Sequence, residues 1–163
     1  MNKLYLLFGS NLGNSKAQLT KARQHIEKLI GPVTRQSSLY ATAAWGNTKQ
    51  PDFLNQVIIV ETELTAVQTM QTILKIEKMM GRIRTIKNAP RIIDIDILFF
   101  NNEIIDQKDL IIPHPQIQNR RFVLIPLNEL APNFNHPVLG LSIHELLKIC
   151  PDRLTVKKFK LSS

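Results

Sequence analysis

The chain has 163 residues, of which 44% are hydrophobic and 21% charged, a composition that suits one compact domain with a buried core. No run approaches the roughly 18 apolar residues of a membrane-spanning helix, and residues 1–11 lack the apolar stretch of a secretory signal. Because Cys150 is the only cysteine, no internal disulfide can form and a reducing, cytoplasmic location is expected. The formal net charge of +8 indicates an anionic partner such as nucleic acid, a membrane surface or a polyphosphate.

Hydrophobic periodicity predicts the secondary structure in chain order. Short apolar runs indicate strands, and apolar residues three to four apart indicate helices. The predicted order is strand, helix, strand, strand, helix, strand, over residues 3–8, 15–30, 33–41, 54–62, 65–80 and 92–100. Asn101-Asn102 then starts a short hairpin, and the proline-rich remainder predicts loops and short elements.

This order predicts the fold class. It is the split arrangement of ferredoxin-like sandwiches, an α+β class in which an antiparallel sheet carries its helices on one face. The extra hairpin and the C-terminal elements are expected as additions to that sandwich. No repeat or linker interrupts the chain, so we expect one domain over residues 1–163.

The segment RIIDIDILFF, residues 91–100, places two aspartates within an apolar strand. Alternate residues of a strand share a face. Asp94 and Asp96 are therefore expected together on the open face of the sheet, along with Ile92, Leu98 and Phe100. The opposite face, toward the helices, is expected to carry Ile93, Ile95, Ile97 and Phe99.

These two carboxylates admit two interpretations. They are either two solvated acids or a site for a divalent cation, because like charges roughly 6–7 Å apart repel each other unless a cation lies between them. Mg²⁺ commonly uses one or two carboxylates together with substrate phosphates.

A basic loop lies next to the aspartates. Its cations are Arg82, Arg84, Lys87 and Arg91. The guanidinium group of an arginine can hydrogen-bond two phosphate oxygens at once and can stabilise the charge that develops as a phosphoryl group is transferred. Each cation alone suits a solvated loop, but the set beside two carboxylates indicates phosphoryl transfer with ATP and magnesium. His114, between two prolines, is a further candidate, whereas the phosphate-binding motif G-x-x-x-x-G-K-[ST] is absent from the sequence.

Several motifs occur together along the chain. They are GSN (9–11), SSLYATAAWG (37–46), QPDFLN (50–55), G-R-x-R (81–84), P-R-x-x-D-x-D (90–96) and P-H-x-x-x-x-x-R (113–120). In this combination the chain, from Leu4 to about Pro132, resembles the 6-hydroxymethyl-7,8-dihydropterin pyrophosphokinase family. The resemblance implies transfer of pyrophosphate from ATP to the hydroxymethyl group of 6-hydroxymethyl-7,8-dihydropterin, with release of AMP, in folate biosynthesis.

The resemblance also implies roles for individual residues. Asp94 and Asp96 are expected to bind two Mg²⁺ ions and to form the catalytic set with Arg82 and Arg91. The pterin-binding residues implied are Thr42, Ala43, Ala44, Trp45, Phe53, Asn55 and Phe122. The nucleotide-binding residues implied are Glu77, Arg84, Lys87, Arg91, Ile97, His114 and Arg120. Without the resemblance, the residue pattern alone places Phe53 and Phe122 in the core.

Two loops, residues 43–52 and 82–90, are expected to close over this site and exclude water. The expected partners are ATP and the pterin, bound by a monomer or a weak homodimer. Nucleic acid is not expected as a partner, because acids on the sheet face repel phosphate, and neither is a membrane.

Overall fold

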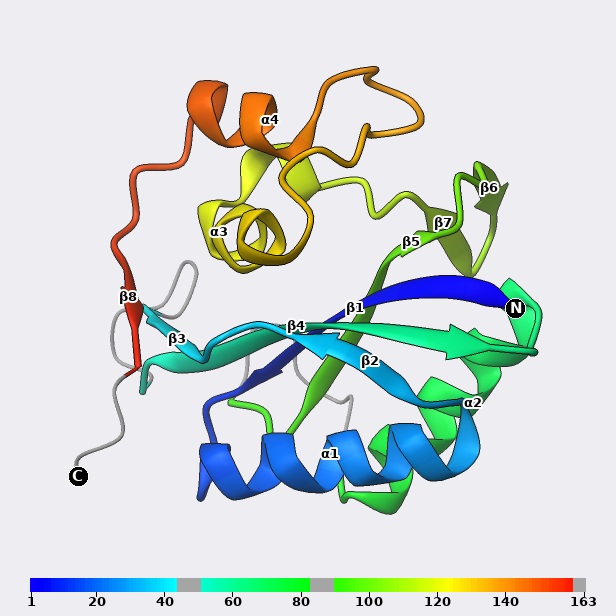
Figure 1. Cartoon of the computed structure of the whole chain (residues 1–163). Helices are drawn as coiled ribbons and strands as arrows, with labels where there is room; N and C mark the ends of the chain where they lie inside the picture. Colours follow the sequence, from blue (N-terminus) through cyan, green and yellow to red (C-terminus); the bar gives the residue numbers. More distant parts are fainter. Residues whose placement is uncertain (44–50, 83–89, 160–163) are drawn as a thin grey trace.

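An antiparallel sheet lies between two pairs of helices (Figure 1). The computed structural model describes residues 1–43, 51–82 and 90–159. The strands of the sheet are β1 (Asn2–Ser10), β2 (Val33–Gln36), β3 (Tyr40–Thr42), β4 (Phe53–Thr62), β5 (Asp94–Phe100) and β8 (Val156–Lys158). Their order is β5-β1-β4-β3-β8, and β2 also pairs with β4.

The helices cover both faces of this sheet. They are α1 (Ser15–Leu29), α2 (Ala66–Met79), α3 (Arg121–Leu130) and α4 (Ile143–Ile149). A hairpin of β6 (Ile105–Gln107) and β7 (Leu110–Ile112) and a short 3-10 helix, η1 (Ile117–Asn119), connect β5 to α3. In the described part of the chain, no helix is long and apolar enough to cross a membrane.

The two helices predicted in the first half of the chain are confirmed. The helix α1 begins after Asn14, whose side chain accepts a backbone hydrogen bond of the first turn, and α2 begins after Thr65, which forms a reciprocal capping box with Gln68. Both helices turn an apolar stripe toward the sheet, where Ile26 and Ile73 are fully buried.

The prediction of one continuous strand over residues 33–41 is wrong. The strand β2 ends at Gln36, and β3 begins only at Tyr40. Between them, the Ser37 N–H donates to the Val57 carbonyl oxygen (2.9 Å), and Ser37 Oγ accepts from the Val57 N–H (3.0 Å). A side-chain oxygen thus takes the place of a backbone acceptor at this point, and the regular ladder is interrupted.

The prediction that helices cover only one face is also wrong. The helices α3 and α4 cover the face opposite to α1 and α2 (Figure 1). They bury a second core made of Tyr5, Leu7, Val57, Ile59, Leu98, Phe99, Ile117, Val123, Leu124, Leu127, Leu130, Ile143, Leu146 and Cys150. Prolines suggested loops in this region, yet Pro126 lies inside α3. Burial of the apolar face of α3 outweighs the single helical hydrogen bond that a proline removes.

A β-bulge changes the faces assigned to the end of β5. The register against β1 pairs Tyr5 with Phe99 but Leu6 with Ile97, so Leu98 is an extra residue. Consequently Phe99 packs with the core under α3, and Phe100 packs with the core over α1 and α2, the reverse of the prediction. The predicted common face of Asp94 and Asp96 is upstream of the bulge and is confirmed, because they pair with Gly9 and Leu7.

Candidate active site

A cavity of about 360 Å³ opens at the end of the sheet where β5 begins. We call it the first cavity. Its described lining comprises Leu7, Gly9, Thr42, Ala43, Phe53, Asn55, Arg82, Arg91, Asp94, Asp96, His114, Arg120 and Phe122. Most of the site residues proposed from the sequence are therefore brought together, although they come from six separate segments of the chain.

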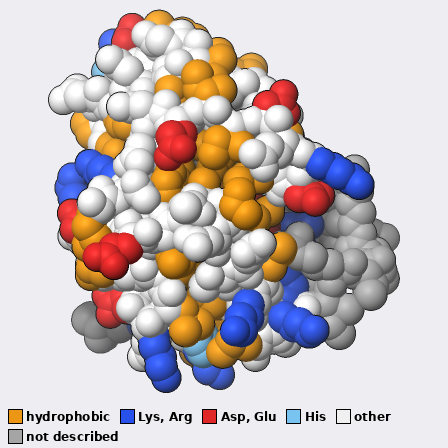
Figure 2. All heavy atoms as spheres, turned by 90° about the vertical axis from the view of Figure 1, so that its right-hand side faces the viewer, with side chains coloured by type: hydrophobic (Ala, Val, Ile, Leu, Met, Phe, Trp, Pro, Cys, Tyr) orange, Lys and Arg blue, Asp and Glu red, His pale blue; other side chains and the backbone are white. Residues whose placement is uncertain are grey.

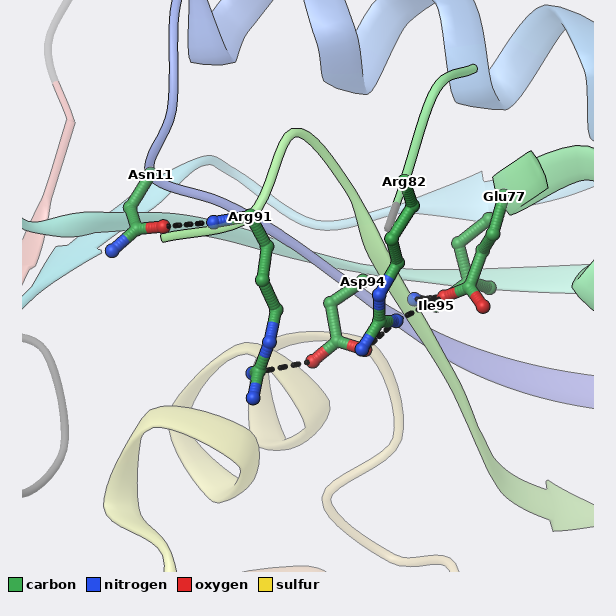
Figure 3. A network of polar contacts seen from close by, with 6 residues as sticks. All are labelled: Asn11, Glu77, Arg82, Arg91, Asp94 and Ile95. Atoms are coloured by element: carbon green, nitrogen blue, oxygen red, sulfur yellow. Dashed lines mark hydrogen bonds and ion pairs between the residues drawn. The ribbon is translucent and has the colours of Figure 1, made fainter. Parts of the chain in front are cut away.

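Asp94 is held by two arginines (Figure 3). One nitrogen of Arg82, Nη1, lies 2.6 Å from Glu77 Oε2 and 2.7 Å from Asp94 Oδ1. Arg91 Nη1 lies 3.3 Å from the other oxygen of Asp94. Burial alone lowers the pKa of Arg82, but the charges of Asp94 and Glu77 outweigh burial and hold that pKa above its ordinary value. Two permanent cations thus converge on Asp94.

Glu77 is buried and lies behind Arg82, outside the described lining of the first cavity. Its Oε2 accepts from the Ile95 N–H (2.9 Å) as well as from Arg82. The side chain therefore connects α2 to β5 at the point where the acid pair begins. Glu77 therefore positions Arg82 and does not itself belong to the described lining of the cavity.

Asn11 and Gly9 belong to the site but were not singled out from the sequence, although the GSN motif contains both. The Asn11 side chain accepts from the Arg91 N–H (2.8 Å), and the Asn11 N–H donates to the Arg91 carbonyl oxygen (3.0 Å). A Cβ atom at Gly9 would lie 3.1 Å from Asn55 Oδ1 and 3.5 Å from Phe53 Cδ1. Asn11 thus orients Arg91, and Gly9 leaves room in the cavity.

Asp96 lies beside Asp94 and lines the first cavity. Burial, followed by the charges of Asp94 and Glu77, raises the pKa of Asp96 to about 7, against the opposing charges of Arg82 and Arg120. No hydrogen bond to the Asp96 carboxylate occurs among the described residues. A carboxylate held close to a second carboxylate and without a hydrogen-bond donor is well suited to a divalent cation.

The protein supplies few ligands for such a cation. Among the described residues, no group of three or more His, Cys, Asp or Glu side chains could hold a metal. Asp94 and Asp96 alone fit Mg²⁺, which keeps several water molecules or substrate oxygens in its coordination shell. A structural zinc site needs four protein ligands and does not fit.

The opposite wall of the first cavity is formed by two phenylalanine rings and the side-chain amide of Asn55. Asn55 is 3% exposed, and its Nδ2 donates to Thr42 Oγ1 (3.0 Å). This bond fixes the amide, so that its Oδ1 faces Gly9. Phe53 and Phe122 line the same space and are only partly buried, in contrast to the core position that their pattern alone suggested.

A second cavity of about 320 Å³ shares Asp96 and His114 with the first. Its lining comprises Met70, Ile73, Leu74, Ile95, Asp96, Ile97, Lys108, Asp109, Leu110, Ile111, His114 and Pro115. It lies between α2 and β7, on the side of the molecule that Figure 2 turns toward the viewer, where hydrophobic side chains gather between charged ones. Ile97 lines this second cavity and is not part of the described lining of the first cavity.

His114 stands at the junction of the two cavities. Burial and then the charge of Arg120 lower the pKa of His114 to about 4, so the imidazole is neutral near pH 7. Its Nδ1 accepts from the Gln116 N–H (3.1 Å), which leaves Nε2 as the protonated nitrogen that can donate.

The remaining proposed residues are Ala44, Trp45, Arg84 and Lys87. They lie outside the described residues, as does most of the two loops expected to close over the site. Their assignment stays a prediction from the sequence.

Comparison with known proteins identifies the family. The model of the 7,8-dihydro-6-hydroxymethylpterin-pyrophosphokinase (HPPK) family matches residues 5–132. A 2-amino-4-hydroxy-6-hydroxymethyldihydropteridine pyrophosphokinase of Methylorubrum extorquens is 39% identical over 134 residues, which cover 82% of this chain and 85% of that protein. A protein of the same name from Aquifex aeolicus is 38% identical over 138 residues, 85% of this chain and 86% of that protein.

Longer proteins contain a similar segment. The folic acid synthesis protein FOL1 of Dictyostelium discoideum is 39% identical over 145 residues, which span 89% of this chain but 22% of that protein. A crystal structure of Plasmodium falciparum HPPK-DHPS with SDX-DHP superimposes with a TM-score of 0.74 at 20% identity, over 91% of this chain and 43% of that chain. At this identity the likeness concerns the fold alone. From the matched residues and the relatives covered over most of their length, the chain belongs to the 7,8-dihydro-6-hydroxymethylpterin-pyrophosphokinase family.

Proposed function

We propose that this chain transfers pyrophosphate from ATP to the hydroxymethyl oxygen of 6-hydroxymethyl-7,8-dihydropterin, with AMP as the leaving group, in folate biosynthesis. One observation carries the proposal: a single cavity joins an acid pair flanked by two arginines to a wall of two phenylalanines and a fixed amide. The first half of this set suits polyphosphate, and the second suits a flat heterocycle.

The transfer is a displacement at the β-phosphorus of ATP. The substrate hydroxyl oxygen forms a bond to that phosphorus and loses its proton to water, as the bond from the β-phosphorus to the AMP oxygen breaks. Asp94 and Asp96 would hold Mg²⁺ on the phosphates, and the bound metal would neutralise charge on the attacking and leaving oxygens. The protein's own contribution is to place both substrates in one cavity and to exclude water.

Arg82 and Arg91 are suited to contact the phosphates. Both guanidinium groups lie at Asp94, on the side of the cavity where the polyphosphate would sit beside the acid pair. Among the described residues, Arg82 Nε is buried and has no hydrogen-bond partner. Fixed cations at the phosphates stabilise the charge that develops as the bonds exchange.

The pterin is suited to the aromatic wall. A flat ring between Phe53 and Phe122 gains offset stacking on both faces. Asn55 Oδ1 can accept a hydrogen bond from the ring edge, because the amide is already anchored through its nitrogen to Thr42. This pairing of stacking and in-plane contacts selects a planar, hydrogen-bonding ring.

The nucleoside of ATP is suited to the second cavity. Since Asp96 and His114 line both cavities, phosphates at the acid pair would direct the nucleoside past His114 toward Ile97 and Leu110. The neutral His114 can donate through Nε2 to a phosphate or ribose oxygen at this junction.

The proposal includes the ferredoxin-like fold, the cellular location and the oligomeric state that were expected from the sequence. The strand order β5-β1-β4-β2, with α1 and α2 on one face, supports the ferredoxin-like assignment. The cytoplasmic location, the single domain, the monomeric or weakly dimeric state and the lack of nucleic-acid or membrane partners remain proposals from sequence.

The test is a product analysis. The protein is incubated with ATP, Mg²⁺ and 6-hydroxymethyl-7,8-dihydropterin, and nucleotides are separated by chromatography. AMP and the pterin pyrophosphate are expected in equal amounts, and only after all three components are combined. Formation of ADP in place of AMP, or the absence of any product, contradicts the proposal.

A further inference from the structure

The segment after α4 reaches back to the active site. It runs from Cys150 through Asp152 to β8, beyond the residues 5–132 that the family model matches. Asp152 is only 8% exposed, and both of its carboxylate oxygens accept backbone hydrogen bonds. Oδ2 accepts from the Arg121 N–H (2.9 Å), and Oδ1 accepts from the Leu154 N–H (2.9 Å).

The first of these bonds caps α3. The residue preceding that helix, Arg120, makes no side-chain cap of its own. The first N–H groups of a helix have no intrahelical partner, and the positive end of the helix dipole favours a carboxylate. Asp152 therefore supplies, from 31 residues downstream, the cap that the local sequence lacks.

The capped position lies between two residues of the first cavity. Arg121 is flanked by Arg120 and Phe122, which both line that cavity, and the Arg120 guanidinium lies 5.9 Å from the centre of the Phe122 ring. The direction of these two side chains depends on where the first turn of α3 begins. A shift of this turn would move both of them relative to the acid pair and the pterin wall.

The same segment also contacts the other side of the cavity. After the turn at Asp152, β8 pairs with β3, and Val156 lies opposite Thr42, which lines the cavity and binds Asn55. The segment thus connects the α3 wall of the first cavity to the β3 wall.

We propose that Asp152 is a positioning residue for substrate binding: its carboxylate fixes the first turn of α3 and thereby the places of Arg120 and Phe122. The inference rests on the proposed function, because Phe122 is taken to stack on the pterin. It adds a residue that touches neither substrate and lies outside the matched family segment.

The test is a comparison of steady-state constants for three variants. Asp152→Ala removes both acceptors, and we expect the KM for the pterin to rise about fivefold, as for the loss of a helix cap near a binding residue, while kcat changes less. Asp152→Asn keeps one acceptor oxygen and is expected to lie between Asp152→Ala and the wild type. Ser142→Ala removes the side-chain cap of α4, a helix none of whose residues is in the described lining of the cavity, and is the matched control.

Each outcome is decisive. A raised pterin KM in Asp152→Ala, partial rescue by Asp152→Asn and a wild-type KM in Ser142→Ala support the assignment. A wild-type KM in Asp152→Ala, or the same rise in Ser142→Ala, overturns it while leaving the proposed function intact, because the wild type still makes AMP. A wild type that makes no AMP overturns the proposed function, and the assignment with it.

Discussion

Arg82 and Glu77 form an ion pair of 2.6 Å in which both side chains are almost fully buried, with 8% and 2% of their surfaces exposed. The same guanidinium nitrogen also contacts Asp94. A buried acid on α2 thus determines where an active-site cation lies, although the acid is outside the described cavity lining. Four consequences of the geometry can be measured.

Replacing Glu77 is expected to damage both stability and turnover. In Glu77→Gln the charge that faces Arg82 is lost, although an acceptor for the Ile95 N–H is retained. We expect the free energy of unfolding to fall by about 1–3 kcal/mol, as for a buried charge-assisted bond, and kcat to fall because Arg82 is less firmly held. Urea unfolding and the AMP assay measure the two effects. Glu61→Gln, at an exposed position near the end of β4, is the control and should change neither.

Replacing Asp96 by asparagine is expected to raise the stability of the metal-free protein and to lower its activity. The ordinary pKa of an aspartate is about 4, and that of Asp96 is raised to about 7 in the folded protein. Its contribution to stability is therefore fully present below pH 4 and is lost progressively as pH rises through 7. Metal-free Asp96→Asn should melt at a higher temperature than the metal-free wild type at pH 8, and the difference should be smaller at pH 5. Its turnover should be lower by about 10²–10³-fold or more. Equal melting temperatures at pH 8 would contradict the electrostatic account, and retained turnover would contradict the metal assignment.

Adding a methyl group at Gly9 is expected to impair pterin binding selectively. The new Cβ would lie 3.1 Å from Asn55 Oδ1, so the Asn55 side chain must shift slightly. We expect Gly9→Ala to raise the KM for the pterin about tenfold, corresponding to about 1.4 kcal/mol of binding free energy, with the KM for ATP nearly unchanged. Equal increases in both constants would indicate a general disturbance of β1 and would refute the proposed selectivity.

Acid is expected to destabilise the protein through a histidine remote from the site. His136 is buried, its Nδ1 accepts from the Val138 and Leu139 N–H groups, and burial lowers its pKa. Its neutral form therefore stabilises the fold above the ordinary pKa of about 6.5, and this contribution is lost as pH falls below that value. Between pH 7.5 and 5, the unfolding free energy of the wild type should therefore decrease relative to that of His136→Asn, which keeps an acceptor and does not titrate. An identical pH dependence of the two proteins would refute the assignment.

The local pattern predicted much of the region around the acid pair. Strand alternation is a property of the backbone, so the common face of Asp94 and Asp96 could be inferred without knowing the fold. The capping box of Thr65 and Gln68 at the start of α2, seen in the structure, is equally local, because it involves only neighbouring residues. The identity of the substrates, in contrast, came from the resemblance to a family and not from the spacing of the residues.

Contacts between distant segments could not be predicted in this way. The bulge that exchanges the faces of Phe99 and Phe100 depends on the register between β5 and β1. The helix α3 forms despite Pro126 because its apolar side packs against the sheet. The free energy of this packing is not part of the helix propensity of the residues themselves.

The chain by itself thus determined its secondary-structure periods, its acid pair and its basic loop, because these depend on residues a few positions apart. Only the tertiary structure decided that Glu77 anchors Arg82, that Gly9 leaves room beside Asn55, and that Asp152 caps α3. Each of these contacts joins residues that are near in space but far apart or unpatterned in sequence, so their effect arises from packing, burial and charge in the folded molecule.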